Sequence, residues 1–392
     1  MNNPLKYTCL FGGGAIRGLA YIGTIRALEE LNIEYDIIGG SSVGSIFATL
    51  VACGYKSYEL ENLFMKVNFE LFKDIHLGFG KGLALSRGEI FLDWLNELIS
   101  RKADDIKNKK LSFKDIEKEL VIITTNLKKF NTQEFSKTET PDFEIAKAIR
   151  ISSSMPGLMA PFIYKDEELV DGDLQKASPM WRLSKTLNNS PSRILEFRLE
   201  GDCGDTGKSP VAFINQIYSC VTDVATEFVS EIYGQNDRFD CIRLNTGDIF
   251  FADFNLDKDS RRKLINSGYE QTMKYFKEFL PKKKEKLEAV YSKALNYLKQ
   301  ANKGLKSGNV EEVQWWFGDL FILLCENKEI IDPCIYEQIV DLKNLLADST
   351  ATVLFFYSKF KNQKNLEIAM KDVLKTLETR VADIKLYLQN TP

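Results

Sequence analysis

The chain has 392 residues, of which 44% are hydrophobic and 27% are charged, and its formal net charge is -3. This is ordinary globular composition in a chain long enough for two domains, and it provides no strong basic field to attract nucleic acid. No apolar run approaches the ~20 residues that a membrane-spanning helix needs. Seven cysteines are scattered without a Cys-x-x-Cys pair beside a single histidine, which argues against a zinc site and indicates reduced thiols.

Strand-like and helix-like runs alternate through the first part of the chain. The predicted strands are short apolar runs at residues 7–11, 37–39, 121–125, 168–170, 194–199 and 241–244. The predicted helices cover residues 19–31, 45–53, 89–101, 143–151, 212–232 and 260–280. This alternation favours an α/β fold, with a mostly parallel sheet and helices on both faces. Sheets of this kind bind ligands at the carboxyl ends of their strands.

Strand signals nearly vanish beyond Pro281 and the lysine-rich residues 282–286. Helical spacing or helix-like composition continues through residues 287–298, 310–325, 333–360 and 366–388, with breaks and caps expected at Gly304, Gly308 and Asp332-Pro333. We therefore predict an α/β domain over residues 1–280 and an all-α domain over residues 281–392. The second domain is expected to be an antiparallel four-helix bundle, and it is either a structural cap or a regulatory or partner-binding module.

The pentapeptide Gly40-Ser41-Ser42-Val43-Gly44 lies between a predicted strand and a predicted helix. Strand, sharp turn and helix form the context of a nucleophile elbow, in which flanking glycines let the turn expose one hydroxyl, here that of Ser42. The N–H groups of the following helix point at the same place. The pentapeptide alone is more often a structural turn, so the interpretation depends on further motifs.

A second glycine-rich segment, Gly12-Gly13-Gly14-Ala15-Ile16-Arg17-Gly18, follows the first predicted strand. It fails the dinucleotide pattern Gly-x-Gly-x-x-Gly, because the third glycine would fall at Arg17, and it lacks the Gly-Lys-Ser/Thr of a phosphate loop. The remaining functional interpretation is an oxyanion hole, in which the N–H groups of Gly13 and Gly14 donate to a developing alkoxide.

A serine nucleophile also needs a base. His76 is the single histidine, and it precedes every plausible acid, unlike the histidine of an α/β-hydrolase. Asp171-Gly172-Asp173 follows the predicted strand at residues 168–170. Asp-Gly is a common turn signal, but an aspartate at a strand end can reach a serine. Burial and a hydrogen bond from Ser42 would be needed to make Asp171 an effective base.

Four motifs in this order resemble the patatin-like phospholipase family over about residues 7–199: Gly-Gly-Gly-x-x-Arg-Gly, Gly-x-Ser-x-Gly, Ser152-Ser153-Ser154-Met155-Pro156-Gly157 and Asp-Gly. The resemblance implies a lipid acyl hydrolase with a Ser-Asp dyad. By position it implies Ser42 as the nucleophile and Asp171 as the base. The oxyanion hole would then involve Gly12, Gly13, Gly14, Arg17 and the N–H of Val43. Arg17 either shapes the loop or adds positive potential, and no cofactor or metal is expected.

One position departs from the resemblance. The family usually has Asp-Gly-Gly or Asp-Gly-Ala, whereas the third residue here is Asp173. A buried second carboxyl would raise the pKa of Asp171; alternatively, Asp173 points into solvent or pairs with a cation. This departure supports an alternative function, a catalytically weak or inactive patatin-like interaction protein that acts through its helical C-terminal region.

The expected partner is membrane or micellar lipid, contacted peripherally, with no nucleic acid and with a protein or small-molecule activator acting through residues 281–392. We expect a cytoplasmic protein, with or without peripheral membrane contact, because cleavage of a leader would remove the glycine loop. Residues 250–254 contain three phenylalanines and are either core or an edge that dips into lipid. Phe69, Leu71, Phe72 and residues 78–88 are expected to form a mobile cover over the site.

Overall fold

The computed structural model describes residues 7–73, 86–102, 110–174, 193–201, 217, 220, 239–353, 357–360 and 363–389. The chain divides into two compact units. Unit 1 comprises Met1–Gly234 and Phe239–Tyr275, and unit 2 comprises Gln235–Arg238 and Phe276–Pro392. This division follows compactness alone, so the domain boundary at residue 280 stays a prediction.

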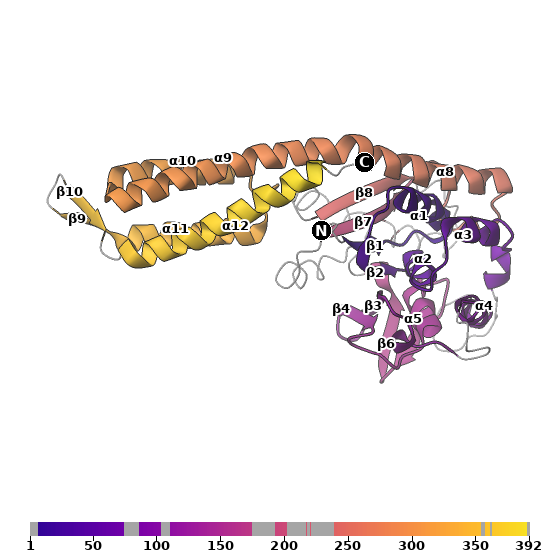
Figure 1. Cartoon of the computed structure of the whole chain (residues 1–392). Coiled ribbons are helices and arrows are strands. Elements are labelled where there is room, and N and C mark those ends of the chain that lie inside the picture. The colour runs from indigo at the N-terminus through magenta and orange to yellow at the C-terminus, as the bar shows by residue number, and fades with distance from the viewer. Residues whose placement is uncertain are drawn as a thin grey trace. The chain divides into compact units, whose positions relative to one another are not determined.

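Unit 1 is built on a mixed sheet to which eight strands of the described residues belong (Figure 1). Parallel pairing joins the strands in the order β3-β2-β1-β7-β8. These strands are β1 (Tyr7–Phe11), β2 (Tyr35–Ser41), β3 (Glu119–Asn126), β7 (Arg193–Glu200) and β8 (Phe239–Asn245). Antiparallel pairing adds β4 (Asn131–Ser136), β5 (Phe162–Tyr164) and β6 (Glu167–Asp171). The predicted mostly parallel α/β sheet is confirmed.

The central strands are buried on both faces. Every residue of β1 is buried, as is every residue of β3 except the first. Parallel strands covered on both faces form continuous apolar runs, which is why both were visible in the sequence. The helices of unit 1 in the described residues are α1 (Ala20–Glu30), α2 (Val43–Ala52), α3 (Ser57–Phe64), α4 (Glu89–Ser100), α5 (Ile145–Ser152) and α8 (Lys258–Lys274).

Most predicted elements of unit 1 are confirmed to within a few residues, but α3, β4 and β5 were missed. The sequence of β4 is polar, and it becomes a strand because it pairs with β3 over six residues. The predicted helix over residues 260–280 divides into α8 and a π-helical turn at Tyr275–Phe279. The predicted helix over residues 212–232 lies outside the described residues apart from Ile217 and Cys220.

Two strands run toward each other along one edge of β3, and their C-terminal ends meet there. β2 pairs with residues 119–123, and β6 pairs in the opposite direction with residues 124–126. β4 pairs along residues 121–126, so it occupies the other edge. Ser41 is therefore in register with Ile123, and Asp171 with Thr124. The turn after β2 and the turn after β6 meet at this point, although they lie far apart in the sequence.

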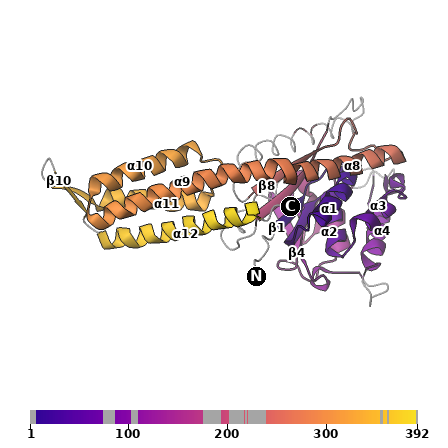
Figure 2. The same cartoon turned by 45° about the horizontal axis from the view of Figure 1, so that its top comes forward.

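Unit 2 is a bundle of helices, which lie alongside one another in two views (Figure 1, Figure 2). They are α9 (Leu280–Ser307), α10 (Val310–Glu326), α11 (Pro333–Ser349) and α12 (Gln363–Gln389). One apolar core runs through them and takes residues from all four helices, among them Tyr291, Phe317, Ile339 and Leu377. Among the described residues, no helix is both long and apolar enough to cross a membrane.

The helix ends in unit 2 test the predicted breaks. Gly308 ends α9 in the left-handed conformation at φ 73°, a common role of glycine. Asp332 Oδ1 accepts the N–H of Cys334 at 2.9 Å at the start of α11. The breaks at Gly308 and Asp332-Pro333 are confirmed. The break predicted at Gly304 is wrong, because this residue lies within α9. A Cβ on Gly304 would lie 3.2 Å from Val313 Cγ2.

The helix predicted over residues 333–360 is wrong beyond Ser349. β9 (Thr350–Val353) pairs antiparallel with β10 (Tyr357–Phe360). The sequence of β9, Thr-Ala-Thr-Val, is rich in β-branched residues, which lose side-chain freedom in a helix and favour strands. A small hairpin must therefore be added to the all-α description of this region.

Candidate active site

Ser42 lies in the sharp turn between β2 and α2 and has φ 47° and ψ -128°. This backbone conformation is unfavourable for a non-glycine residue, costs about 1–3 kcal/mol and is concentrated at functional sites. Gly40 and Gly44 make the turn sterically feasible. A Cβ on Gly44 would lie 2.0 Å from the carbonyl oxygen of Phe11, and one on Gly40 would lie 2.5 Å from the carbonyl oxygen of Gly44.

One side chain ties this strained turn to the sheet. The N–H of Ser42 donates to Ser152 Oγ at 2.9 Å, and Ser152 Oγ donates to the carbonyl oxygen of Ile123 at 2.5 Å. Ser152 ends α5 and is fully buried. Sequence reasoning used Ser152 only as part of a motif and missed this contact, because a run of serines does not indicate which hydroxyl faces a backbone group.

The glycine loop follows β1 directly. The N–H of Gly12 donates to the carbonyl oxygen of Phe197 at 3.0 Å and so extends the pairing of β1 with β7. The carboxyl group of Asp173 lies against Gly13, because Asp173 Oδ2 is 1.5 Å from the position that a Cβ on Gly13 would take. The carbonyl oxygen of Gly14 accepts the N–H of Arg17 at 3.1 Å. Within this loop, Gly13 is the residue in contact with the turn after β6.

The side chain of Arg17 contacts the segment after β8. Its Nε donates to the carbonyl oxygen of Ile249 at 2.7 Å, and the residue is 7% exposed. The N–H of Ile16 donates to the carbonyl oxygen of Phe251 at 3.1 Å. Two hydrogen bonds thus join the glycine loop to residues 249–251. This placement supports the structural role of the two that were considered for Arg17.

Asp171 is fully buried at the end of β6. Its N–H donates to the carbonyl oxygen of Ser154 at 3.1 Å, and its Oδ1 accepts the N–H of Asp173 at 2.9 Å. A Cβ on Gly172 would lie 3.0 Å from Ser41 Cβ. The turn that carries Asp171 is therefore packed against the turn that carries Ser42.

Asp173 is 7% exposed, so it does not point into solvent. Ser41 Oγ donates to its Oδ1. Burial raises the pKa of Asp173, while the hydrogen bond from Ser41, the positive charge of Arg198 and the N–H of Gly13 oppose that rise. Of the environments considered for Asp173, burial together with Asp171 is the one observed.

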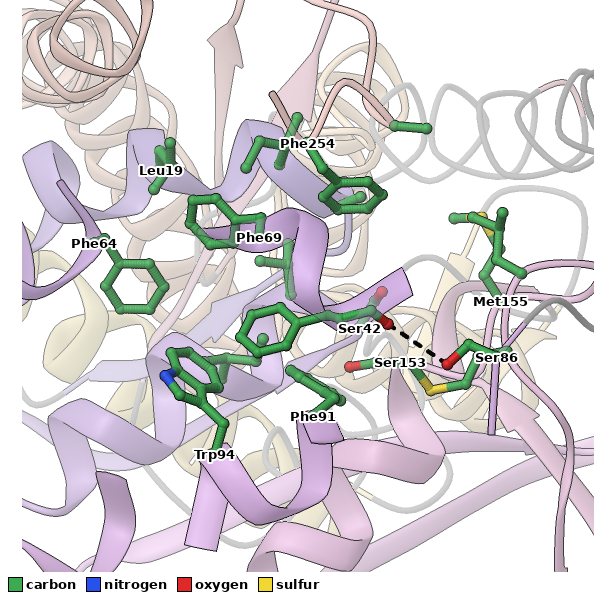
Figure 3. Close-up of a pocket in the computed structure, with 18 of the residues that line it drawn as sticks. Leu19, Ser42, Phe64, Phe69, Ser86, Phe91, Trp94, Ser153, Met155 and Phe254 are labelled. Carbon is green, nitrogen blue, oxygen red and sulfur yellow. Dashed lines mark hydrogen bonds between the residues drawn. The ribbon is translucent and has the colours of Figure 1, made fainter. Parts of the chain in front are cut away.

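Ser42 forms part of the wall of a cavity of about 250 Å³ in unit 1. The rings of Phe64, Phe69, Phe91 and Trp94 crowd one side of this cavity, and Ser86 and Met155 lie on the other (Figure 3). Apart from Ser42, Ser86 and Ser153, the lining residues are apolar; the others are Ala15, Ile16, Leu19, Val43, Ile46, Phe47, Phe72, Leu158, Met159, Ala252 and Phe254. Such a lining suits a hydrocarbon chain.

Phe69 and Phe72 were expected in a cover over the site, whereas the other aromatic residues of this cavity were not expected there. Phe69, Phe72 and Phe254 line it, and Phe251 is 5% exposed and packs with Met155. This supports the core alternative for residues 250–254. Phe64, Phe91 and Trp94 were not identified, because the apolar face of an amphipathic helix has the same sequence pattern whether it packs in a core or lines a cavity.

Part of the predicted site lies outside the described residues. His76 and residues 78–85 of the expected cover belong to this part, so both stay predictions. Within the part that is described, no group of three or more His, Cys, Asp or Glu side chains is placed to hold a metal ion.

Residues 10–182 match the family model of the patatin-like phospholipases. Uncharacterized protein R571 of Acanthamoeba polyphaga mimivirus is 31% identical over 279 residues, which cover 68% of this chain and 92% of that protein. The probable lipid hydrolase 463L of Invertebrate iridescent virus 6 is 26% identical over 179 residues, 44% of this chain and 61% of that protein. VipD from Legionella pneumophila, a crystal structure, has a similar fold at TM-score 0.50 and 15% identity, over 97% of this chain and 88% of that chain. The chain belongs to the patatin-like phospholipase family.

Proposed function

We propose that this protein is a lipid acyl hydrolase of the phospholipase A type, which cleaves acyl esters through a Ser42–Asp171 dyad. The observation that carries the proposal is the strained Ser42 turn, which opens on an apolar cavity. Membership of the patatin-like family and the name of the viral lipid hydrolase support a lipid ester as substrate.

In the first step, Ser42 Oγ attacks the carbonyl carbon of the ester while Asp171 accepts the hydroxyl proton. The negative charge moves to the carbonyl oxygen, which accepts hydrogen bonds from the glycine loop and from the N–H of Val43 at the start of α2. One such donor is typically worth about 3 kcal/mol of the barrier. The C–O bond to the leaving alcohol then breaks, and that alcohol takes the proton from Asp171.

In the second step, Asp171 accepts a proton from water, and the resulting nucleophile attacks the acyl-enzyme. The fatty acid leaves and Ser42 recovers its proton. During both steps the alkyl part of the acyl group would occupy the apolar cavity beside Ser42. These residues supply the base and the oxyanion donors.

The same proposal covers access and control. The substrate is presented by a membrane or a micelle, and we propose peripheral contact with that surface. We also propose a protein or small-molecule activator that acts through residues 281–392. Two large side chains on α10 support a surface for such a partner, because Trp315 is 65% and Ile322 57% exposed; these residues are seven positions apart and so share one helix face.

The direct test is incubation with vesicles of phosphatidylcholine and with a triacylglycerol emulsion, followed by mass spectrometry of released fatty acids and lyso-products. S42A and D171N are expected to reduce fatty acid release at least about a thousandfold while the protein stays folded. A matched control is D259A, which removes an acid whose side chain is 85% exposed. Near-normal turnover by D171N, or loss of activity in H76A alone, would show that the dyad is wrong.

The alternative is an inactive interaction protein that keeps the fold. One observation favours it, namely that the carboxyl group of Asp173 lies against Gly13 of the glycine loop. Labelling with a fluorophosphonate, which reacts with activated serines, separates the two functions. Labelling that disappears in S42A supports the enzyme, and the absence of labelling at Ser42 supports the interaction protein.

A further inference from the structure

The carboxyl group of Asp173 lies between the glycine loop and the serine turn. Its Oδ1 accepts the Ser41 hydroxyl, and its Oδ2 lies against Gly13. Asp173 itself lies in a short 3-10 turn directly after Asp171. The side chain of Asp173 thus contacts two other segments of the site, one through a hydrogen bond from Ser41 and one through packing against Gly13.

The contacts around Gly13 show where this carboxyl group lies. A Cβ on Gly13 would lie 1.5 Å from Asp173 Oδ2 and 3.0 Å from Ser42 Cβ. The carboxyl oxygen and the nucleophilic serine therefore contact the same face of one glycine. In the proposed reaction, the carbonyl oxygen of the ester accepts a hydrogen bond from the N–H of Gly13 at this place, while negative charge develops on that oxygen.

The surroundings of Asp173 suit an anion. Arg198 lies beneath the glycine loop, where its Cδ is 3.4 Å and its Nη1 3.7 Å from the position of a Cβ on Gly12. Arg198 is paired with Glu196 at 2.6 Å, and its charge also acts on Asp173. A buried cation and inward-pointing N–H groups are the features that stabilise an oxyanion.

We propose that Asp173 is an internal ligand of the oxyanion site: its carboxyl group covers Gly13 in the resting protein and must move away before an ester can be cleaved. The inference rests on the proposed function and adds to it a side chain that competes with the substrate for the oxyanion site. A substrate carbonyl oxygen is a weaker acceptor than a carboxylate, so Asp173 lowers the reactivity of Ser42 until substrate or an activator displaces it.

The test compares the rate at which a fluorophosphonate labels Ser42 in the wild-type protein, D173A and D173N. In this reaction Ser42 Oγ bonds to phosphorus, fluoride leaves, Asp171 takes the serine proton, and the phosphoryl oxygen accepts the N–H of Gly13. We expect D173A to react at least about tenfold faster than wild type, because one charge-assisted hydrogen bond is worth about that factor. D173N keeps an acceptor oxygen but no charge and should be several-fold faster. The exposed-acid control D259A should match wild type.

A second measurement does not depend on catalysis. Dodecanoate carries an alkyl chain for the cavity and a carboxylate for the vacated anion site, whereas dodecanol carries the chain alone. Dodecanoate should raise the melting temperature of D173A more than that of wild type, and dodecanol should shift both equally. D173N serves in the same comparison if D173A does not fold.

The outcomes separate the two proposals. Labelling of Ser42 at equal or lower rates in folded D173A and D173N, or equal stabilisation by dodecanoate, would overturn the role of Asp173 and leave the proposed hydrolase standing. Absence of labelling in every variant would refute the hydrolase and, with it, this inference.

Discussion

Ser152→Ala is the most informative single change, because one hydroxyl satisfies two buried backbone groups. Ser152 Oγ accepts from the N–H of Ser42 and donates to the carbonyl oxygen of Ile123. Alanine removes both hydrogen bonds where Ser152 is fully buried, so water cannot replace them without rearrangement. An unsatisfied buried group costs about 1–3 kcal/mol, and the two together should lower the free energy of unfolding by about 2–4 kcal/mol.

Two assays check this prediction. In a unit of this size, about 2–4 kcal/mol corresponds to a fall in melting temperature of about 5–15 °C, which differential scanning fluorimetry resolves. Freed from Ser152, the turn at Ser42 can relax from its strained geometry, and kcat for a short p-nitrophenyl ester should fall about a hundredfold. KM should change little, because the cavity walls are untouched.

The matched control is Ser153→Ala. Ser153 Oγ is buried without a hydrogen-bond partner among the described residues, so its removal should not lower the melting temperature. A wild-type melting temperature together with wild-type kcat in S152A would refute the claim that this hydroxyl holds the serine turn in its reactive geometry.

Three further predictions concern the same site. Gly13→Ala places a Cβ 1.5 Å from Asp173 Oδ2 and 3.0 Å from Ser42 Cβ, so fluorophosphonate labelling of Ser42 should slow at least about a hundredfold; a wild-type labelling rate would contradict the position assigned to the loop. Ile46→Phe adds bulk to the cavity wall one helical turn after Ser42, and should reduce kcat/KM for a twelve-carbon ester more than for a four-carbon ester; an equal reduction for both would argue against the cavity as the acyl site. Burial raises the pKa of Asp173 above its ordinary value of 3.8, so the folded state binds this proton more tightly and the stability from this group falls as the pH rises from the unfolded pKa through the folded pKa. The free energy of unfolding of wild type minus that of D173N, measured by urea titration, should therefore decrease with rising pH in that window, and a constant difference would contradict it.

The motif-bearing part of the site was accessible from the sequence because its chemistry depends on residue types at short spacing. Gly40 and Gly44 lie where backbone segments around Ser42 are in close contact. Glycine permits such contact because it has no Cβ. The same holds for the glycine loop after β1. A strand followed by Asp171 indicated a carboxylate at a strand end, and Asp171 does end β6.

The partners of these residues could not be predicted, because they come from distant segments. No local pattern shows that Ser152 accepts the N–H of Ser42, or that Asp173 faces Gly13 rather than solvent. The same applies to β4, a polar segment that is a strand only because β3 pairs with it. Propensity is a weak signal where pairing with a neighbouring strand determines the conformation.

By itself, the sequence determined most helices and strands of unit 1, the sharp turn at Ser42 and the residue types around it, since periodicity and glycine spacing are local properties of the chain. Only the tertiary structure decided that β2 and β6 meet head to head on one edge of β3. That meeting places the turn that carries Ser42 against the turn that carries Asp171 and Asp173. It depends on long-range strand pairing, and strand register is set by packing across the whole sheet rather than by neighbouring residues.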